Sequence, residues 1–237
     1  MKREIPARGR SLPLLLAEHR ERLAGCRKCG HPDSVLPIVS NARAPRVMLV
    51  GQAPGKTEAA DQRPFAGRAG RTLFRWLERA GVDERAARAH IYIGAITRCY
   101  PGPSASGRGD RVPSPREREL CAEWLDGELR LIRPALVILV GRLAIDRFIG
   151  PLPLEQVIGQ QFIVDHPGGR SAAIPLPHPS GASSWIHQSG HGALLEEALR
   201  LLRRALDRCG VPMAPAAARA RRAPPVGAGR RPARGVA

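Results

Sequence analysis

Short apolar runs alternate with helical patterns along most of this chain, and the alternation restricts the folds that the chain can adopt. Each run is nearly all apolar and rich in Val, Ile or Leu, which is typical of strands buried on both faces of a sheet. We expect strands at 46–51, 91–97, 135–141 and about 171–176. We expect helices at 11–25, 69–80, 115–132, 142–149 and about 190–208. The pattern predicts an α/β fold, a three-layer α/β/α sandwich around a central, mostly parallel sheet of four strands.

The length of the chain, 237 residues, suits one α/β domain followed by a tail. We expect the domain to span residues 1–210. From Val211 onward the chain is rich in Ala, Pro, Gly and Arg without a hydrophobic period, so we expect 211–237 to be a disordered basic tail. No apolar run approaches the ~18 residues of a membrane span, and the N-terminal MKREIPARGR lacks the apolar stretch of a signal peptide. We therefore expect a soluble, cytoplasmic protein with no membrane partner.

The formal net charge of the chain is +17, and Arg supplies nearly all of it. Lysine occurs only at Lys2, Lys28 and Lys56. Because neutralisation of phosphates drives non-specific binding to nucleic acids, a polyanionic partner is the first expectation, and it would associate the protein with the nucleoid. A GC-rich genome offers a second explanation, since it also yields a composition rich in Arg, Ala, Gly and Pro.

Four of the five cysteines are candidates for a metal centre. Cys26 and Cys29 form a C-x-x-C pair, and Cys99 and Cys121 lie far downstream on either side of a segment rich in Gly, Pro and Ser. Four thiolates can hold a tetrahedral zinc ion or a [4Fe–4S] cluster. A structural zinc site usually draws on two compact pairs, whereas the wide separation of the second pair favours a larger cluster. Four buried structural cysteines are the remaining alternative.

The stretch GQAPGKT at 51–57 follows a predicted strand and looks at first like a nucleotide-binding P-loop. A P-loop has four residues between its glycines, so that consecutive backbone N–H groups surround a phosphate. Only three residues separate Gly51 from Gly55, and one of them is Pro54, which has no N–H group. The spacing therefore disfavours an enzyme that hydrolyses nucleotides.

Several polar and aromatic residues are predicted to gather where the strands end, which is where doubly wound sheets bind ligands. The segments concerned are the GQAPG turn with Glu58, Arg63-Pro64-Phe65, Gly94-Ala95 and 177–181. Together they offer backbone donors, an aromatic ring, an imidazole and a carboxylate, which would suit recognition of a nucleobase turned out of its helix. Taken singly, each has a plainer explanation as a turn or a core residue.

These residues give the chain a resemblance to the iron–sulfur branches of the uracil-DNA glycosylase superfamily, families four and five. Family four carries G-E-A-P-G-x-x-E-D after a strand, then R-P-F-x-G-x-A-G, and later H-P-S/A. This chain has GQAPGKTEA at 51–59, RPFAGRAG at 63–70 and HPS at 178–180. The match runs in the same order over roughly residues 20–205. The four cluster cysteines of the family correspond to Cys26, Cys29, Cys99 and Cys121.

The resemblance implies an activity, a cofactor and a partner. The protein would be a monofunctional, monomeric DNA glycosylase that starts base excision repair. It would hydrolyse the N-glycosidic bond of uracil, or of other deaminated bases, in DNA. The four cysteines would hold a structural [4Fe–4S] cluster, with zinc as the alternative, because hydrolysis of this bond transfers no electrons.

The resemblance also implies roles for individual residues. Backbone groups of Gln52 and Ala53 would line the pocket beside Ala95, and Phe65 would stack on the extruded base. His178 would donate to the pyrimidine O2 as negative charge develops there. Glu58 would orient or activate the attacking water, so the catalytic candidates are Glu58, His178 and Gln52. The segment Ser180, Gly181 and Ala182 would enter the DNA helix where the base has left.

The chain also departs from both families. Family four has an Asn, in a T-N-V-V-K-C pattern, whose amide reads the edge of uracil, whereas Ala95 stands there in this chain. Gln52 replaces the acid of the first motif. Family five has Ala in a similar position and accepts more deaminated bases, but its downstream Asp is Arg68 here. The loop 100–115 is longer than expected, and its residues Arg108 and Arg111 are candidate contacts for phosphates.

Two alternatives to a monofunctional enzyme remain open. Ala95 and Gln52 are compatible with a catalytically weak iron–sulfur protein that binds damaged DNA. A bifunctional glycosylase and lyase would need an amine nucleophile to form a Schiff base, and Lys56 is the only lysine near the predicted pocket.

Overall fold

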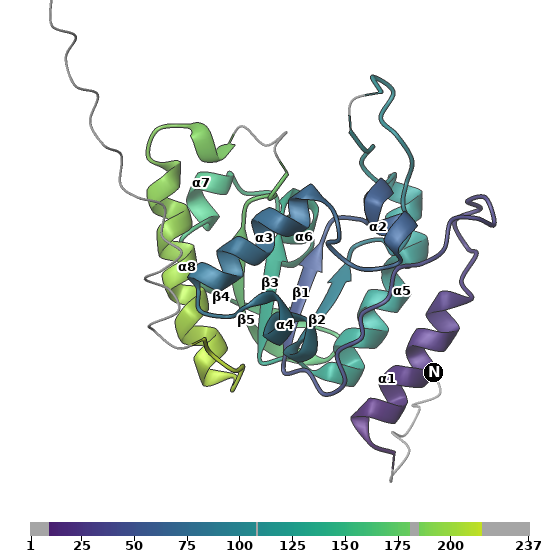
Figure 1. Ribbon diagram of the computed structural model, residues 1–237, viewed down its shortest axis with the longest axis horizontal. Helices are drawn as coiled ribbons and strands as arrows, with labels where there is room; N and C mark the ends of the chain where they lie inside the picture. Colours follow the sequence, from purple (N-terminus) through teal and green to yellow (C-terminus); the bar gives the residue numbers. More distant parts are fainter. Residues whose placement is uncertain (1–9, 108, 181–184, 215–237) are drawn as a thin grey trace, which may run out of the picture.

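The computed structural model describes residues 10–107, 109–180 and 185–214. Helices lie between the successive parallel strands, as the sequence predicts, and three short helices at 56–61, 84–90 and 154–157 add to the predicted ones (Figure 1). The strands are β1 (Val47–Gly51), β2 (Ile91–Ala95), β3 (Leu136–Val140), β4 (Phe162–His166) and β5 (Gly169–Leu176). The α-helices are α1 (Leu12–Ala24), α2 (Lys56–Asp61), α3 (Arg68–Arg79), α4 (Glu84–His90), α5 (Pro115–Ile132), α6 (Arg142–Phe148), α7 (Leu154–Val157) and α8 (His191–Arg208).

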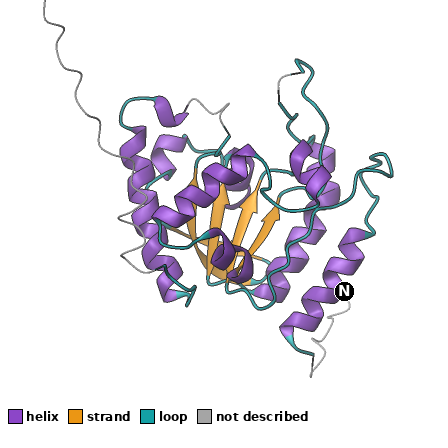
Figure 2. Cartoon of the chain, in the orientation of Figure 1, coloured by secondary structure: helices purple, strands orange, loops and turns teal. Residues whose placement is uncertain are grey.

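The strands form a single sheet in the order β2-β1-β3-β5-β4. β1 pairs in parallel with β2 and β3, and β3 pairs in parallel with β5. Every residue of β1 and β3 is buried, because helices enclose the sheet (Figure 2). The predicted α/β class and the mostly parallel sheet are confirmed.

The prediction of four strands is wrong, because β4 adds a fifth strand at the edge of the sheet. It pairs antiparallel with β5. Val164 is its only buried residue, and Ile163 is 58% exposed. The sequence FIVDH is therefore a half-exposed segment rather than a continuous apolar run, and a search for strands buried on both faces does not find it.

The connections between strands place helices on both faces of the sheet. Parallel crossovers are right-handed in nearly all proteins. The chain passes from β1 to β2 through α2, α3 and α4, and it then returns in the opposite direction to β3 through α5, so α5 lies on the opposite face. α3, α4 and α8 lie together in front of the sheet in Figure 1, and α1 packs against α5. The predicted three-layer sandwich is thus confirmed.

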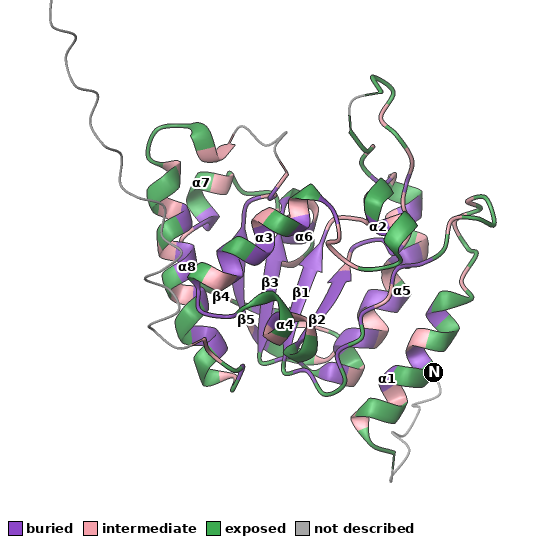
Figure 3. Ribbon diagram, in the orientation of Figure 1, coloured by how far each residue is buried: buried purple, intermediate pink, exposed green. Residues whose placement is uncertain are grey.

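The buried core follows the strands and the inner faces of the helices (Figure 3). It extends past the end of α8, because Val211 is 5% exposed and packs in the same core. The backbone N–H of Ala214 donates to the carbonyl oxygen of Gly81 across 2.7 Å. The rest of the predicted tail, 215–237, lies outside the described residues.

Among the helices of the described segments, none combines the length and the apolar character needed to cross a membrane.

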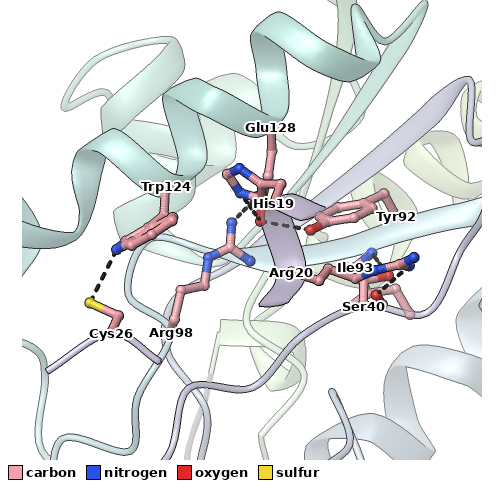
Figure 4. A network of polar contacts seen from close by, with 9 residues as sticks. All are labelled: His19, Arg20, Cys26, Ser40, Tyr92, Ile93, Arg98, Trp124 and Glu128. Atoms are coloured by element: carbon pink, nitrogen blue, oxygen red, sulfur yellow. Dashed lines mark hydrogen bonds and ion pairs between the residues drawn. The ribbon is translucent and has the colours of Figure 1, made fainter. Parts of the chain in front are cut away.

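A charged pair is buried between β2 and α5 (Figure 4). Arg98 and Glu128 form this ion pair, and they are 2% and 0% exposed. The Tyr92 hydroxyl donates to Glu128 Oε1 across 2.7 Å, and His19 Nε2 on α1 lies 3.6 Å from the same oxygen. Burial alone would lower the pKa of Arg98, but Glu128, together with Tyr92 and Cys121, more than offsets that effect, and the pKa is raised. The guanidinium therefore stays charged inside the protein.

We expect Glu128→Gln to lower the free energy of unfolding by about 3–5 kcal/mol, because it leaves the buried Arg98 charge without a counter-charge. Urea denaturation followed by circular dichroism would measure the loss. Glu196→Gln is the control, because it removes the carboxylate that pairs with exposed Arg79 and should cost at most about 1 kcal/mol. Equal losses in the two variants would contradict a special contribution from the buried pair.

Candidate active site

A pocket lies at the carboxyl ends of the parallel strands, where the sequence predicts a site. Parallel strands end at one edge of a sheet, so the loops that follow them meet there even though they are far apart in sequence. The predicted catalytic and base-contacting residues line this pocket: Gln52, Ala53, Glu58, Phe65, Ala95, His178 and Ser180. Gly181 and Ala182, which are predicted to enter the DNA helix with Ser180, lie outside the described residues.

The GQAPG turn is held against the end of β2 by its backbone. The N–H of Ile96 donates to the oxygen of Gly51 across 3.0 Å, and the N–H of Thr97 donates to the oxygen of Gln52 across 3.2 Å. Gly55 then caps the start of α2. These bonds fix the path of Gln52 and Ala53 along the pocket, next to Ala95 at the end of β2.

Phe65 is held in a backbone conformation that side chains rarely adopt, with a φ of +51°. Arg88 of α4 donates to the carbonyl oxygens of Pro64 and Phe65 across 2.8 and 3.3 Å. Gly70 of α3 lies so close that a β-carbon there would stand 1.8 Å from the Phe65 oxygen. The ring lies against Gly51, where a β-carbon would be 3.1 Å from Phe65 Cζ. The neighbours thus fix the ring over the GQAPG turn.

Glu58 connects two loops of the pocket wall. Its Oε2 atom accepts the N–H of Gly55 across 3.0 Å, and its Oε1 atom accepts the N–H of Gly67 across 2.9 Å. The side chain is buried, because the residue is only 9% exposed. Both carboxylate oxygens therefore join the GQAPG turn to the loop that carries Phe65.

His178 follows β5 and is oriented by Ser180. The N–H of Ser180 donates to His178 Nδ1 across 3.3 Å, and the Ser180 hydroxyl lies 2.9 Å from the same nitrogen. Burial lowers the pKa of His178. A neutral ring that accepts at Nδ1 carries its proton at Nε2. Gly141, with a φ of +85°, leaves room for the ring, since a β-carbon there would lie 2.9 Å from His178 Cδ2.

The four predicted cluster cysteines line one cavity, beside the pocket. Cys26 and Cys29 follow α1, Cys99 follows β2, and Cys121 lies on α5. Burial and the three other thiols raise the pKa of Cys99 to about 12. Within the ranges that the structure describes, no three or more His, Cys, Asp or Glu side chains are grouped so as to hold a metal ion.

A sequence model described as the uracil DNA glycosylase superfamily matches residues 37–203. The chain belongs to this superfamily. It is 30% identical over 166 residues to a type-4 uracil-DNA glycosylase of Archaeoglobus fulgidus, covering 67% of this chain and 78% of the relative. A type-4 uracil-DNA glycosylase of Thermotoga maritima is 29% identical over 164 residues, covering 68% and 79%. A type-5 uracil-DNA glycosylase of Thermus thermophilus is 28% identical over 182 residues, covering 71% and 76%.

The match to the uracil DNA glycosylase superfamily confirms the resemblance that the motifs indicate. It also confirms the prediction that the protein is a DNA glycosylase. The matched range includes every predicted pocket residue, whereas Cys26 and Cys29 precede it. Arg88 and Gly141 also contribute to the site, since they contact the loop of Phe65 and leave room for His178, respectively. The sequence analysis did not identify either residue. Arg88 lies in an ordinary helical pattern, and only its contacts with the loop of Phe65 distinguish it.

The long loop between β2 and α5 is anchored at its end by an ion pair. Arg111, a candidate phosphate contact, donates to both oxygens of Glu117, across 2.6 and 2.7 Å, and also lines the pocket. Glu117 also accepts the N–H of Ser114 across 2.7 Å at the start of α5. Arg111 and Ser114 together lower the pKa of Glu117 to about 2. Arg108, the other candidate phosphate contact, lies outside the described residues.

We expect Glu117→Gln to cost about 1.5–3 kcal/mol of stability at neutral pH, because it removes charged hydrogen bonds. The pKa of Glu117 is about 2 in the folded protein and about 4.3 in the unfolded chain. Its contribution is therefore fully present above the unfolded value and is lost as the pH falls toward the folded value.

Chemical denaturation of wild type and Glu117→Gln at a series of pH values would test this. The difference in unfolding free energy should be constant near neutral pH and should shrink below about pH 4. Glu119→Gln, at an exposed position of the same helix, is the control and should show neither the loss nor its pH dependence. A difference that persists unchanged to about pH 2.5 would contradict the assignment.

Proposed function

We propose that this protein is a monofunctional DNA glycosylase that hydrolyses the N-glycosidic bond of uracil in DNA and thereby starts base excision repair. The observation that carries the proposal is the orientation of His178. Its Nδ1 atom is occupied by the N–H of Ser180, so the imidazole offers an Nε2–H donor to the pocket that it lines. The names of the type-4 relatives support the choice of substrate.

The proposed chemistry is stabilisation of an anionic leaving group. When the bond between the base and the sugar breaks, negative charge develops on the pyrimidine O2. A fixed donor at that atom stabilises the transition state more than the ground state. His178 would supply this donor, while Phe65, which neighbouring groups hold over Gly51, would stack on the extruded base. Backbone groups of Gln52 and Ala53 would line the other side of the base.

A hydrolytic mechanism without lyase activity fits Lys28 and Lys56, the two lysines among the described residues. A lyase forms a Schiff base through an amine that reaches the sugar. Lys56 lines the pocket but stands at the start of α2, on a long exposed side chain. Lys28 pairs with Glu123, beside the cysteine cavity. Water is therefore the proposed nucleophile.

We propose that this protein is less specific for one base than a glycosylase that has an amide side chain at the end of β2. Ala95 occupies that place and cannot hydrogen-bond to a base edge through its side chain. A pocket that hydrogen-bonds a specific group strongly rejects a base that lacks it, whereas an apolar wall discriminates weakly. We therefore propose that uracil is the main substrate and that other deaminated bases are also accepted.

The type and number of the cysteines that line one cavity support the proposed [4Fe–4S] cluster, although the described side chains as placed form no group that could hold a metal ion. Four thiols from three separate segments line the cavity, and thiolates are the ligands that such clusters use. The residues that would hold the cluster are Cys26, Cys29, Cys99 and Cys121. When bound, the cluster would supply cross-links between α1, the loop after β2 and α5, with no redox step in the reaction. Zinc is the alternative occupant.

We further propose that the protein acts as a monomer on DNA and associates with the nucleoid. The net charge of +17 supports a nucleic-acid partner, since cationic side chains release the counterions of DNA phosphates on binding.

Cleavage of labelled oligonucleotides by anaerobically purified protein tests the function. The set would contain uracil, hypoxanthine, xanthine and hydroxymethyluracil, single-stranded and opposite each base, with alkali treatment after the reaction. We expect alkali-labile sites at uracil and a reduction of about 100- to 1000-fold in His178→Ala. Borohydride should trap no adduct. Tight binding to uracil-containing DNA without cleavage would instead favour a damage-binding protein.

Iron and acid-labile sulfide analysis of the same preparation tests the cofactor. We expect about four iron and four sulfide per chain, and loss of both in Cys99→Ser. Cys209→Ser is the control, because Cys209 follows α8 and lies outside the cysteine cavity. One zinc per chain without iron would overturn the assignment in favour of a zinc site.

A further inference from the structure

The site contains a carboxylate that the motif comparison did not single out. Asp110 lies on the long loop between β2 and α5 and lines the same pocket as His178 and Phe65. A β-carbon on Gly55 would stand 2.7 Å from Asp110 Oδ2, so the carboxylate lies directly against the GQAPG turn. Hydrolysis by water needs a group that can accept a proton at this site.

Glu58, the other acid of the pocket, has its two oxygens engaged. Each accepts a backbone N–H, one from Gly55 and one from Gly67, and the residue is 9% exposed. Accepting a proton from water would weaken these two bonds and loosen the connection between the two loops. Its contacts therefore fit a positioning residue, which sets the distance between the GQAPG turn and Phe65.

Asp110 is held in place by a small hairpin. Pro103 and Asp110 form an antiparallel bridge. On either side of it, Ser104 N–H donates to the Gly109 oxygen across 2.9 Å, and Arg111 N–H donates to the Gly102 oxygen across 3.0 Å. The ion pair of Arg111 with Glu117 then ties the hairpin to α5. The position of Asp110 is thus fixed by backbone bonds that do not use its carboxylate.

The carboxylate of Asp110 is hydrogen-bonded to one neighbour and is accessible to water. The Tyr100 hydroxyl hydrogen-bonds to the carboxylate, and burial together with the charge of Asp110 raises the pKa of Tyr100. This bond occupies one acceptor position, whereas a carboxylate has about four. Asp110 is exposed, so solvent reaches it. Among the described residues, its neighbours include Tyr100 on its own loop and Gly55 and Glu58 of the opposite wall.

The pocket has an inner and an outer part relative to these residues. Phe65 lies over Gly51, at the end of β1, where the base would stack. Asp110 lies over Gly55, four residues further along the same turn and nearer to solvent. A base bound at Phe65 would have its sugar and phosphates toward this outer part, because the DNA backbone stays outside the pocket.

We propose that Asp110 is the general base that activates the water, a role that rests on the proposed glycosylase function. The water oxygen forms a bond to the sugar C1′, and one of its protons passes to Asp110. The bond between C1′ and the base nitrogen breaks, and its electron pair moves onto the base, where His178 faces the O2. The base anion takes a proton from solvent on release, and Asp110 returns its proton to solvent. The negative charge of Asp110 also stabilises the positive charge that develops on the sugar.

Single-turnover kinetics on uracil-containing DNA, measured as a function of pH, tests the role of Asp110. We expect Asp110→Asn to lower the rate at saturating enzyme by about 100- to 10,000-fold, with binding of the DNA changed by less than about tenfold. The wild-type rate should rise with pH as an acid deprotonates and then level off, and Asp110→Asn should lose this rise. Exogenous formate should partly restore the rate of Asp110→Ala, which a merely structural role would not permit.

Two further variants complete the test. Glu58→Gln should lower thermal stability and weaken DNA binding while it keeps the rise of the rate with pH. Asp61→Asn, an exposed acid at the end of α2, changes the net charge equally and should behave as wild type. Circular dichroism would establish that all variants are folded.

Each other outcome overturns a specific statement. Wild-type rates in Asp110→Asn, or a reduced rate whose rise with pH is intact, would overturn the assignment of Asp110. Loss of the rise in Glu58→Gln alone would make Glu58 the general base. If the wild type cleaves none of the substrates, the proposed function fails and this inference fails with it. If the wild type cleaves uracil-containing DNA and Asp110→Asn cleaves it equally fast, only the inference fails.

Discussion

The buried ion pair of Arg98 with Glu128 is the interaction on which the arrangement of both cavities depends. Arg98 lines the cysteine cavity and the base pocket, so its side chain and backbone belong to the wall that separates them. Its guanidinium lies under β2, where a β-carbon on Gly94 would be 2.7 Å from Arg98 Nη1. Its carbonyl oxygen accepts the N–H of Ile38 across 2.8 Å. One residue therefore sets the spacing of the loop after β2, the segment before β1 and α5.

The pocket itself is assembled largely from backbone groups held by side chains that do not touch the base. Glu58 joins two loops through their N–H groups, and Arg88 holds two consecutive carbonyl oxygens around Phe65. A left-handed residue other than glycine persists only where its surroundings impose it. The φ of +51° at Phe65 is thus a sign of preorganisation, because the ring is placed before the base arrives.

The fold and most of the site could be predicted from the sequence, because both follow from local patterns. Continuous apolar runs identified β1, β2, β3 and β5, and the motif residues cluster because the strands are parallel and share one edge. The edge strand β4 lacks such a run, since only Val164 is buried. The hydrogen bonds of the two Glu58 oxygens and the position of Asp110 depend on contacts between residues of loops. Contacts of this kind produce no periodic pattern in the sequence, so they could not be predicted from it. For the same reason the sequence did not indicate that Arg111 pairs with Glu117, and its contact with a phosphate stays a prediction.

The close approach of Gly141 to His178 couples two positions that are distant in sequence. The imidazole occupies the volume that any side chain at 141 would need, since a β-carbon there would be 2.9 Å from Cδ2. The φ of +85° adds a second barrier to replacement. A larger residue at 141 would therefore strain the backbone at the start of α6 and also displace the imidazole of His178. The choice of residue at position 141 is limited by the placement of a hydrogen-bond donor in another loop as well as by the backbone conformation of the helix start.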